Sequence, residues 1–348
     1  MGDSRAAVLD ADGDDVLAFD VGGANIKAAD GRGWAYGEAF ELWRRRSELP
    51  AALARVVAAR RPRRVVATMT GEIADCYPSR AAGVADIVSA VVAAAPGREV
   101  GIYAVSGAIV PPQAAVARPL EVAAANWHAV ARLAGTLAGR GRALLVDIGS
   151  TTSDLVPLVD GLPVPAARDD VGRLAAGELV YTGVERTPVA AVVSRLPWRG
   201  CMRPVASELF AQSRDVWILL GGLSEQPDSR DTADGGPATA DAARRRLARM
   251  LLADPDDVAP AEAVAMADYW AGRQALVVAR AARRVAAAMG QPPDEVVLSG
   301  HGRCLARRVL GRLGWMAAVT PLADALGDDV SRVGPAHALA LIASGVIR

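Results

Sequence analysis

The chain has 348 residues, with 39 Lys and Arg side chains against 39 Asp and Glu, so its formal net charge is zero. This balance argues against a dominant nucleic-acid-binding or polybasic membrane surface. The length suits roughly two domains of ~150 residues, each with its own core. Lys27 is the only lysine, since the other 38 basic side chains are arginines.

The cysteine content and the first residues both favour a cytoplasmic protein. The chain has three cysteines, Cys76, Cys201 and Cys304, and an odd number in a long chain implies no disulfide framework. The first fifteen residues are polar and acidic and lack the apolar segment of a signal peptide. No apolar run reaches the ~18 residues of a membrane span. A homo-oligomer is compatible with these features, which do not fix the oligomeric state.

After a tail predicted over residues 1–15, apolar strands alternate with helices rich in Ala and Arg. Asp10, Asp12 and Asp14 do not make a calcium loop, because the glycine comes too early and the closing Glu is missing. The predicted strands cover residues 16–20, 64–70, 100–105, 143–147, 216–220 and 296–299, and the predicted helices 47–60, 79–95, 126–139, 238–252, 261–289 and 303–313, with Ser47 and Asn126 as caps. This interleaving predicts an α/β fold.

Two segments of the chain repeat one pattern. Residues 18–27 read AFDVGGANIK and residues 145–154 read LVDIGSTTSD, so each has a strand, an Asp, an aliphatic residue, a Gly and small polar residues. Residues 296–304, VVLSGHGRC, add a strand followed by Gly-x-Gly at a helix start. The first two segments stand about 127 positions apart, which suits duplicated lobes.

A strand that ends in Asp-x-Gly followed by small polar residues is suited to phosphate. Glycines bring backbone N–H groups close to a ligand, and the N–H groups and hydroxyls bind phosphate oxygens. An Asp at the strand end can hold Mg²⁺ through water, and Lys27 can place a point charge on a terminal phosphate. The candidate phosphate-binding residues are Gly22, Gly23, Asn25, Lys27, Gly149, Ser150, Thr151, Thr152, Gly300 and Gly302, with Asp20 and Asp147 as Mg²⁺ ligands. The structural alternatives are ordinary strand–turn sequences and, for Lys27, a solvated charge at a strand edge.

These three segments resemble the two phosphate motifs and the adenosine motif of the actin/hexokinase/Hsp70 superfamily. That resemblance implies two RNase-H-like lobes around a central cleft, the first over residues 16–139 and the second over 140–348, with the C-terminal helix packed back on the first. The stretches MTGEIADCY (69–77), AAANW (123–127) and RLAAGELVYTGVERTPV (173–189) resemble the hydantoinase/oxoprolinase branch more narrowly. Within that branch they are similar to proteins of tetrahydromethanopterin-linked one-carbon metabolism and methanofuran biosynthesis.

The resemblance implies a transferase that joins an aminomethylfuran methyl diphosphate to the phenolic oxygen of a tyramine or tyrosine derivative. Pyrophosphate would leave, with Mg²⁺ and without ATP, so the protein must mainly stabilise diphosphate charge. The phenol also needs a base, for which Asp154, Glu72 and Asp75 are candidates. The candidate catalytic residues are Asp20, Asp147, Asp154 and Glu72, and the candidate substrate-binding residues are Thr70, Asp75, Asn126, Asp169, Arg173, Glu178, Tyr181 and Arg186.

Other interpretations stay open at this point. Glu72 could serve as an acid at a helix start and Asp154 as a hydrogen-bond partner of a site residue. An ATP-dependent kinase, an oxoprolinase-type hydrolase or a non-enzymatic nucleotide sensor would use the same fold. His301 and Cys304 are too few for a zinc site, and His128 and Cys76 are expected to be structural. Residues 168–174 depart from the family pattern, which leaves Asp169 only loosely matched, and residues 226–239 are expected to form a loop with extra residues.

Overall fold

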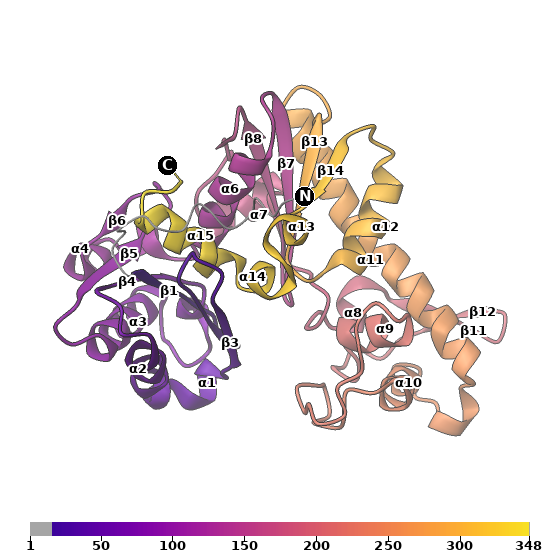
Figure 1. Cartoon of the computed structure of the whole chain (residues 1–348). Coiled ribbons are helices and arrows are strands. Elements are labelled where there is room, and N and C mark those ends of the chain that lie inside the picture. Colours follow the sequence, from indigo (N-terminus) through magenta and orange to yellow (C-terminus); the bar gives the residue numbers. More distant parts are fainter. Residues whose placement is uncertain (1–15, 348) are drawn as a thin grey trace, which may run out of the picture. The chain divides into compact units, whose positions relative to one another are not determined.

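A computed structural model describes residues 16–347 (Figure 1). The predicted tail, with Asp10, Asp12 and Asp14, lies outside the described residues. The chain divides into two compact units. The first unit contains the chain up to Gly141, Leu158–Asp170 and the chain from Pro321 on, and the second contains Arg142–Pro157 and Val171–Thr320. The chain therefore crosses between the units more often than a single boundary after residue 139 would require.

The first unit has a six-stranded sheet in the order β3-β2-β1-β4-β5-β6. β1 runs parallel to β4 and antiparallel to β2, and this second pairing sets Asp20 opposite Lys27. The strands are β1 (Val16–Val21), β2 (Asn25–Ala29), β3 (Ala35–Ala39), β4 (Arg64–Met69), β5 (Glu99–Tyr103) and β6 (Ile109–Val110). Because β1 and β4 are parallel, the loops that follow them leave from the same edge of the sheet.

Alternate side chains of β1 serve the two faces of this sheet. Leu17, Phe19 and Val21 belong to a core formed with α2 and α3, as the period of two in a strand requires. The C-terminal helix α15 packs against β1, β4 and α6. The helical segments and the short strand of this unit are α1 (Leu42–Arg45), η1 (Arg46–Glu48), α2 (Leu49–Arg60), η2 (Gly71–Ile73), α3 (Arg80–Ala94), α4 (Pro112–Ala117), α5 (Pro119–Val122), α6 (Asn126–Leu137), β9 (Leu162–Pro163), α13 (Leu322–Leu326), α14 (Asp328–Arg332) and α15 (Gly334–Ala343).

The second unit repeats the strand order of the first. Its sheet has the order β10-β8-β7-β13-β14, and β7 runs parallel to β13. Counted along the chain, both sheets read third, second, first, fourth, fifth, which is the order of an RNase-H-like lobe. The strands are β7 (Arg142–Ile148), β8 (Ser153–Val159), β10 (Leu179–Val180), β13 (Glu295–Ser299) and β14 (Ala318–Pro321). The repeated pattern of the sequence thus corresponds to a repeated topology, and the predicted α/β class is confirmed.

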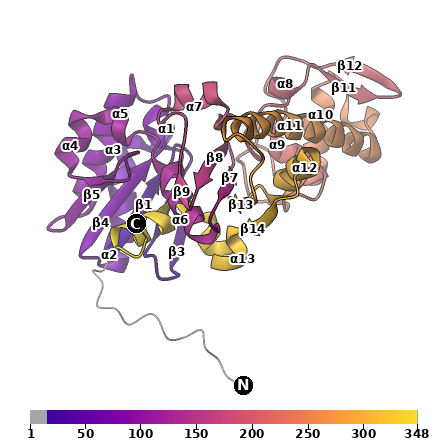
Figure 2. The same cartoon turned by 90° about the horizontal axis from the view of Figure 1, so that it is seen from above.

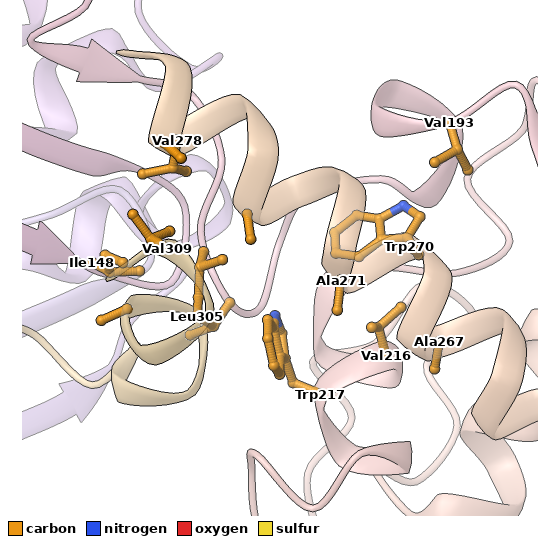
Figure 3. Close-up of a cluster of buried hydrophobic side chains, with 14 of the residues drawn as sticks. Ile148, Val193, Val216, Trp217, Ala267, Trp270, Ala271, Val278, Leu305 and Val309 are labelled. Atoms are coloured by element: carbon orange, nitrogen blue, oxygen red, sulfur yellow. The ribbon is translucent and has the colours of Figure 1, made fainter. Parts of the chain in front are cut away.

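One long helix organises the core of the second unit. α11 (Pro260–Ala288) packs against α9 and α12, and Figure 3 shows its Trp270 near Val216 of α9 and Val193. Trp217 of α9 lies near Leu305 of α12 in the same cluster. The other elements are α7 (Asp170–Ala176), α8 (Val189–Val192), α9 (Ser213–Leu219), α10 (Ala240–Arg249), η3 (Pro255–Asp257), α12 (Arg303–Leu313) and the hairpin β11 (Arg195–Trp198) with β12 (Cys201–Pro204), seen from above in Figure 2.

The predicted strand at residues 216–220 is wrong, because this segment is part of α9. A capping box begins the helix: the Gln212 side chain accepts from the N–H of Asp215, and the N–H of Gln212 donates to the Asp215 carboxylate at 2.9 Å. A short apolar run that is buried all round looks alike in a strand and in a helix, so periodicity alone could not separate the two.

Two predicted helix caps are also wrong, and ion pairs fix one loop that the sequence predicted only as a loop. Glu48, and not Ser47, precedes α2, while Asn126 is the first residue of α6 instead of its cap. Residues 226–239 form the expected loop, but ion pairs fix it to the second unit. Asp231 and Asp234 in this loop accept from Arg214 and Arg246 at 2.8 and 3.0 Å.

Within residues 16–347, no helix combines the length and the apolar character needed to cross a bilayer.

Gly83 on α3 permits a close backbone approach that positions Glu72, and its substitution tests this packing. A Cβ atom at Gly83 would overlap the Glu72 carbonyl oxygen and lie 2.7 Å from Glu72 Cα. Gly83→Ala should therefore cost about 1–3 kcal/mol of stability, measured from urea unfolding. Gly311→Ala on α12 is the matched control, because no atom lies within 4 Å of its added Cβ, and it should raise stability by up to about 1 kcal/mol. Equal effects of the two substitutions would contradict the packing account.

Candidate active site

The end of β1 forms a tight glycine turn in the first unit. The N–H of Gly22 donates to the carbonyl oxygen of Asn25 at 2.9 Å. A Cβ at Gly22 would lie 3.1 Å from this oxygen, and a Cβ at Gly71 would lie 3.1 Å from the Gly22 carbonyl group. The turn is therefore closed by one backbone hydrogen bond and covered by the 70–72 segment, and glycine at both positions leaves room for this close approach.

Asp20 lies at this turn and is paired with the single lysine of the chain. Lys27 Nζ lies 3.9 Å from Asp20 Oδ2, across the antiparallel pairing of β1 and β2. Asp20 is only 3% exposed, and its Oδ1 has no hydrogen-bond partner among the described residues. Burial raises the pKa of Asp20, and the charge of Lys27 opposes this rise in part. The predicted phosphate contact of Lys27 stays a prediction, while its pairing with Asp20 is a feature of the structure.

Glu72 carries a second buried carboxyl group in this unit. Its side chain is 1% exposed, and burial raises its pKa to about 7. The backbone N–H groups of Glu72 itself and of Ala124 oppose this rise, although neither makes a well-formed hydrogen bond to the carboxylate. Asp170 raises the pKa further, and Arg80, which binds Asp170 at 2.7 Å, lowers it. A buried carboxyl group without satisfied oxygens is costly, and such groups concentrate at functional sites.

Of the other candidate site residues, most do not contact the glycine turn of the first unit in the described structure. Thr70 donates its backbone N–H to the carbonyl of Val21 at 3.0 Å, which joins the ends of β1 and β4. Asn126 uses its Oδ1 to accept the N–H of Trp127 at 2.7 Å at the start of α6. Asp75 and Asp169 are exposed. Thr70 is thus the member of this group that the structure brings to the glycine turn.

The end of β7 forms the corresponding glycine turn in the second unit, and a second loop is bound to it. The N–H of Gly149 donates to the carbonyl of Thr152 at 2.9 Å, as Gly22 does to Asn25 in the first unit. The N–H groups of Glu185 and Arg186 both donate to the carbonyl of Ser150 at 3.0 Å. This pairing holds the 183–186 loop against the residues predicted to bind phosphate, and it leaves the side chains of Glu185 and Arg186 half-buried beside them.

A third glycine segment adjoins the end of β7. Gly300 has a φ of +77°, and a Cβ there would lie 2.7 Å from Asp147 Oδ1. The N–H of Gly302 donates to the carbonyl of Ile148 at 3.0 Å, and a Cβ at Gly302 would overlap the Ile148 side chain. Glycine is thus required at both positions, because only it allows the 300–302 turn to approach Asp147 and Ile148 so closely. The structure therefore brings together Asp147, Gly149–Thr152 and Gly300–Gly302, while their phosphate contacts stay a prediction.

An ion-pair chain that the sequence analysis did not assign lies beside these turns. Glu185 Oε1 lies 3.0 Å from His301 Nε2, and Glu185 Oε2 accepts from Arg214 at 2.6 Å. Arg214 also binds Asp231 at 2.8 Å. Burial acts to raise the pKa of Glu185, but the hydrogen bond from His301 and the charge of Arg214 outweigh it and lower the pKa. Glu185 is therefore held as an anion next to the 300–302 turn.

A buried polar network fixes the loop that carries Glu185. The Gln274 side chain on α11 donates to the Thr182 hydroxyl at 2.9 Å and to the Gly183 carbonyl at 2.7 Å. Trp217 donates to the other end of the same amide at 3.0 Å. The Thr187 hydroxyl accepts the N–H of Gly183 at 3.0 Å. Because these buried polar groups are satisfied by one another, the network specifies one conformation of the loop.

The remaining candidates of the second unit separate into buried and exposed residues. Arg173 is 1% exposed and donates to Asp154 at 2.9 Å and to the carbonyl of Glu178 at 3.1 Å. It therefore orders Asp154 and the end of α7 in the described structure. Glu178 is also buried, whereas Tyr181 is 63% exposed. Of these residues, Tyr181 is the one placed to meet a ligand directly.

Glu185 and Arg214 could not be selected from the sequence. Glu185 lies within the GVERTP stretch, in which the neighbouring Arg186 is the residue that predicts carboxylate binding. His301 was considered only together with Cys304 as a zinc site, for which two residues are too few. Burial raises the pKa of the Cys304 thiol to about 11, and residues 16–347 contain no group of three metal-binding side chains. The signal missed was an acidic residue one position from a predicted ligand.

The family model for hydantoinase/oxoprolinase matches residues 63–322. The chain belongs to the hydantoinase/oxoprolinase family. This match spans both units and contains the Gly149–Thr152 and Gly300–Gly302 turns, as the resemblance of the sequence implied.

Two curated relatives are closer in sequence than the solved structures. The chain is 30% identical over 328 residues, 93% of this chain and 96% of the relative, to the (4-{4-[2-(gamma-L-glutamylamino)ethyl]phenoxymethyl}furan-2-yl)methanamine synthase of Methanocaldococcus jannaschii. It is 27% identical over 201 residues, 57% of this chain and 89% of the relative, to the synthase of the same name from Methanococcus vannielii. A solved structure, the activator of 2-hydroxyisocaproyl-CoA dehydratase from Clostridium difficile with bound ADPNP, matches with a TM-score of 0.44 and 11% identity over 95% of this chain and 94% of that one.

The carboxylates at the ends of β1 and β7, each considered within its own unit, fit a magnesium ion that is shared with a phosphate ligand. Asp20 offers a buried Oδ1 without a partner among residues 16–347, and Asp147 is half-buried at the end of β7. Mg²⁺ in phosphate sites takes only one or two carboxylates and keeps water and phosphate oxygens as its other ligands. The absence of a three-residue metal cluster among the described residues is therefore compatible with this ion.

The buried Glu72 should make stability depend on pH in a way that Glu72→Gln removes. The pKa of Glu72 is raised from 4.5 to about 7, so the native state binds more protons than the unfolded state between these values. The stabilisation by the protonated Glu72 carboxyl group is therefore fully present below pH ~4.5 and is lost as pH rises through ~7. This loss lowers the free energy of unfolding by about 3 kcal/mol. The difference in unfolding free energy between Glu72→Gln and wild type, followed from pH 4 to 8, should shift in favour of the variant. A difference that stays constant with pH would show that the carboxyl group titrates normally.

Proposed function

We propose that the protein is a transferase that condenses an aminomethylfuran methyl diphosphate with the phenolic oxygen of a tyramine or tyrosine derivative. The reaction releases pyrophosphate and forms the ether of a methanofuran-type cofactor. The observation that carries the proposal is the identity of 30% over 93% of the chain to a curated synthase. The name of that relative describes a product with a phenoxymethyl link to a furan, which is the ether this reaction would form.

In the proposed reaction, the main catalytic requirement is to stabilise the departing diphosphate anion. The bond between the furan methylene carbon and the diphosphate oxygen breaks, and its electron pair leaves with the diphosphate. The phenolic oxygen bonds to the same carbon and gives up its proton. Because the furan ring delocalises positive charge on the methylene, stabilising the diphosphate is the largest demand. The glycine turns at the ends of β1 and β7 are the groups that we assign to the diphosphate.

The two turns have features that suit this role. Each is closed by one backbone hydrogen bond, from Gly22 to Asn25 and from Gly149 to Thr152. The second turn adds the hydroxyl groups of Ser150, Thr151 and Thr152, of which the first two lie 3.4 Å apart. Small hydroxyls and closely approaching backbone groups are the elements of phosphate-binding loops. Mg²⁺ held by the carboxylate at the strand end of a turn, Asp20 in the first unit or Asp147 in the second, would neutralise diphosphate charge when bound.

Among the carboxylates considered for the phenol proton, the structure favours Glu72. Asp154 is engaged by Arg173 at 2.9 Å, and Asp75 is exposed to solvent. Burial raises the pKa of Glu72 to about 7, and a base with a pKa near the working pH is the best matched for proton transfer. The proposal therefore gives the role of proton acceptor to Glu72.

A pyrophosphate-release assay tests the proposed reaction directly. The protein is incubated with Mg²⁺ and an aminomethylfuran methyl diphosphate, with and without tyramine or γ-glutamyltyramine. We expect pyrophosphate release that depends on the phenol and an equal amount of the ether by mass spectrometry. No release with any phenol, or ATP consumption without the furan substrate, would contradict the proposal and favour an ATP-dependent kinase or hydrolase of the same fold.

Asp147→Asn provides the control that ties release to the β7 turn. This change keeps the size of the side chain and removes its charge next to Gly300. Turnover should fall by at least ~10²-fold, as for the loss of other groups that stabilise developing charge, while the thermal unfolding midpoint stays near that of wild type. Retained activity in this variant would separate the reaction from the turn.

A further inference from the structure

The second unit carries an open groove between α11 and the edge strand β10. One cavity of about 320 Å³ lies there, and a second of about 190 Å³ adjoins it through Val180, Tyr181 and Val277, which line both. We call this feature the α11 groove and define it by the lining residues that the argument uses: Leu174, Leu179, Tyr181, Val277, Arg280 and Arg284. All of these residues belong to the second unit, so the groove is complete within it.

The groove combines an exposed apolar surface with uncompensated positive charge. Tyr181, Leu174 and Val277 are 63%, 47% and 43% exposed, which is unusual for three neighbouring large apolar side chains. Arg280 and Arg284 lie one turn apart on the same face of α11. Within residues 16–347, neither arginine makes an ion pair with an acidic side chain. A ligand with both an aromatic ring and a carboxylate would match this surface.

Strand pairing connects one end of the groove to the proposed diphosphate turn. Val180 pairs with Ser153 in the antiparallel ladder of β10 and β8, and the Ser153 hydroxyl donates to the carbonyl of Thr182 at 2.8 Å. Tyr181, between these two contacts, therefore lies at the start of β8, where the Gly149–Thr152 turn ends. Arg284 lies one α11 turn further than Arg280. An elongated ligand could thus have its ring at Tyr181 and its tail along α11.

The adjoining cavity touches the network that holds the 183–186 loop. Thr182, Thr187 and Gln274 line it, and the Gln274 amide donates to the carbonyl of Gly183 at 2.7 Å. A ligand in the groove would therefore contact the same residues that fix this loop against Ser150. The groove is therefore connected, through this hydrogen-bond network, to the Gly149–Thr152 turn that we assign to the diphosphate.

We propose that the α11 groove binds the phenolic acceptor, with the ring against Tyr181, Leu174 and Val277 and a carboxylate-bearing tail on Arg280 and Arg284. This inference rests on the proposed function. It adds where the acceptor binds and which side chains hold its acidic tail, a tail that the product name of the relative from Methanocaldococcus jannaschii also contains. Two guanidinium groups one turn apart bind carboxylates in a charge-assisted manner that an ammonium or hydroxyl tail cannot use.

Steady-state kinetics with two acceptors test this assignment. The double variant Arg280→Gln/Arg284→Gln is compared with wild type on γ-glutamyltyramine, which has a carboxylate tail, and on tyramine, which has none. We expect KM for γ-glutamyltyramine to rise about tenfold, as expected for the loss of charge-assisted contacts in a solvent-accessible groove. KM for tyramine and both kcat values should change less than about twofold. Arg273→Gln is the matched control, because Arg273 is an exposed arginine of α11 that does not line the groove.

Other outcomes would overturn the assignment. Equal changes in KM for both acceptors, or no change for either, would contradict the contact between the two arginines and the carboxylate. A change in the sedimentation coefficient of the double variant without a change in KM would show that the groove is a surface between copies of the chain. If wild type releases no pyrophosphate with either phenol, the proposed function fails. Calorimetric binding of γ-glutamyltyramine that the double variant weakens would then still support the groove, and equal binding by both proteins would overturn it.

Discussion

The site of the second unit depends on one backbone interaction, the donation of two successive N–H groups to the carbonyl of Ser150. Glu185 and Arg186 supply these N–H groups at 3.0 Å, and the N–H of Val184 donates to Gly149 at the same distance. Only glycine fits at position 183, since a Cβ there would lie 2.5 Å from the Gly149 carbonyl oxygen. This contact sets a loop that is more than thirty residues away in sequence against the end of β7, where the Glu185 side chain lies 3.0 Å from His301 Nε2.

Buried charge maintains this arrangement at a cost to stability. Arg246 is 1% exposed and binds Asp215 at 2.8 Å, and burial raises the pKa of Asp215 despite this pairing. A buried ion pair adds little net stability, but removal of one partner leaves the other uncompensated. Asp215 also caps α9, which carries Trp217 toward the Gln274 amide. The ion pair is therefore connected, through one helix, to the network that fixes the 183–186 loop.

The sequence allowed the prediction of features that depend on local pattern, and it failed where tertiary contacts decide. The strands that end at Asp20 and Asp147 were predictable because apolar runs, acids and glycines follow one another along the chain. The pairing of Lys27 with Asp20 depends on strand register. Residues 216–220 became helical because Gln212 and Asp215 cap them and the second core surrounds them. The α11 groove joins residues about a hundred positions apart, so no local pattern could predict it.

The central claim is that the glycine turn at the end of β7, with the 300–302 turn that adjoins it, binds diphosphate. Amide chemical shifts of isotope-labelled protein, followed during titration with pyrophosphate and Mg²⁺, test it most directly. The account predicts that the largest changes are at residues 149–152 and 300–302, with smaller ones at the 183–186 loop that is hydrogen-bonded to Ser150. Inorganic phosphate at the same concentration should produce smaller changes at the same amides. Saturating changes elsewhere in the second unit, or none at these two turns, would contradict the account.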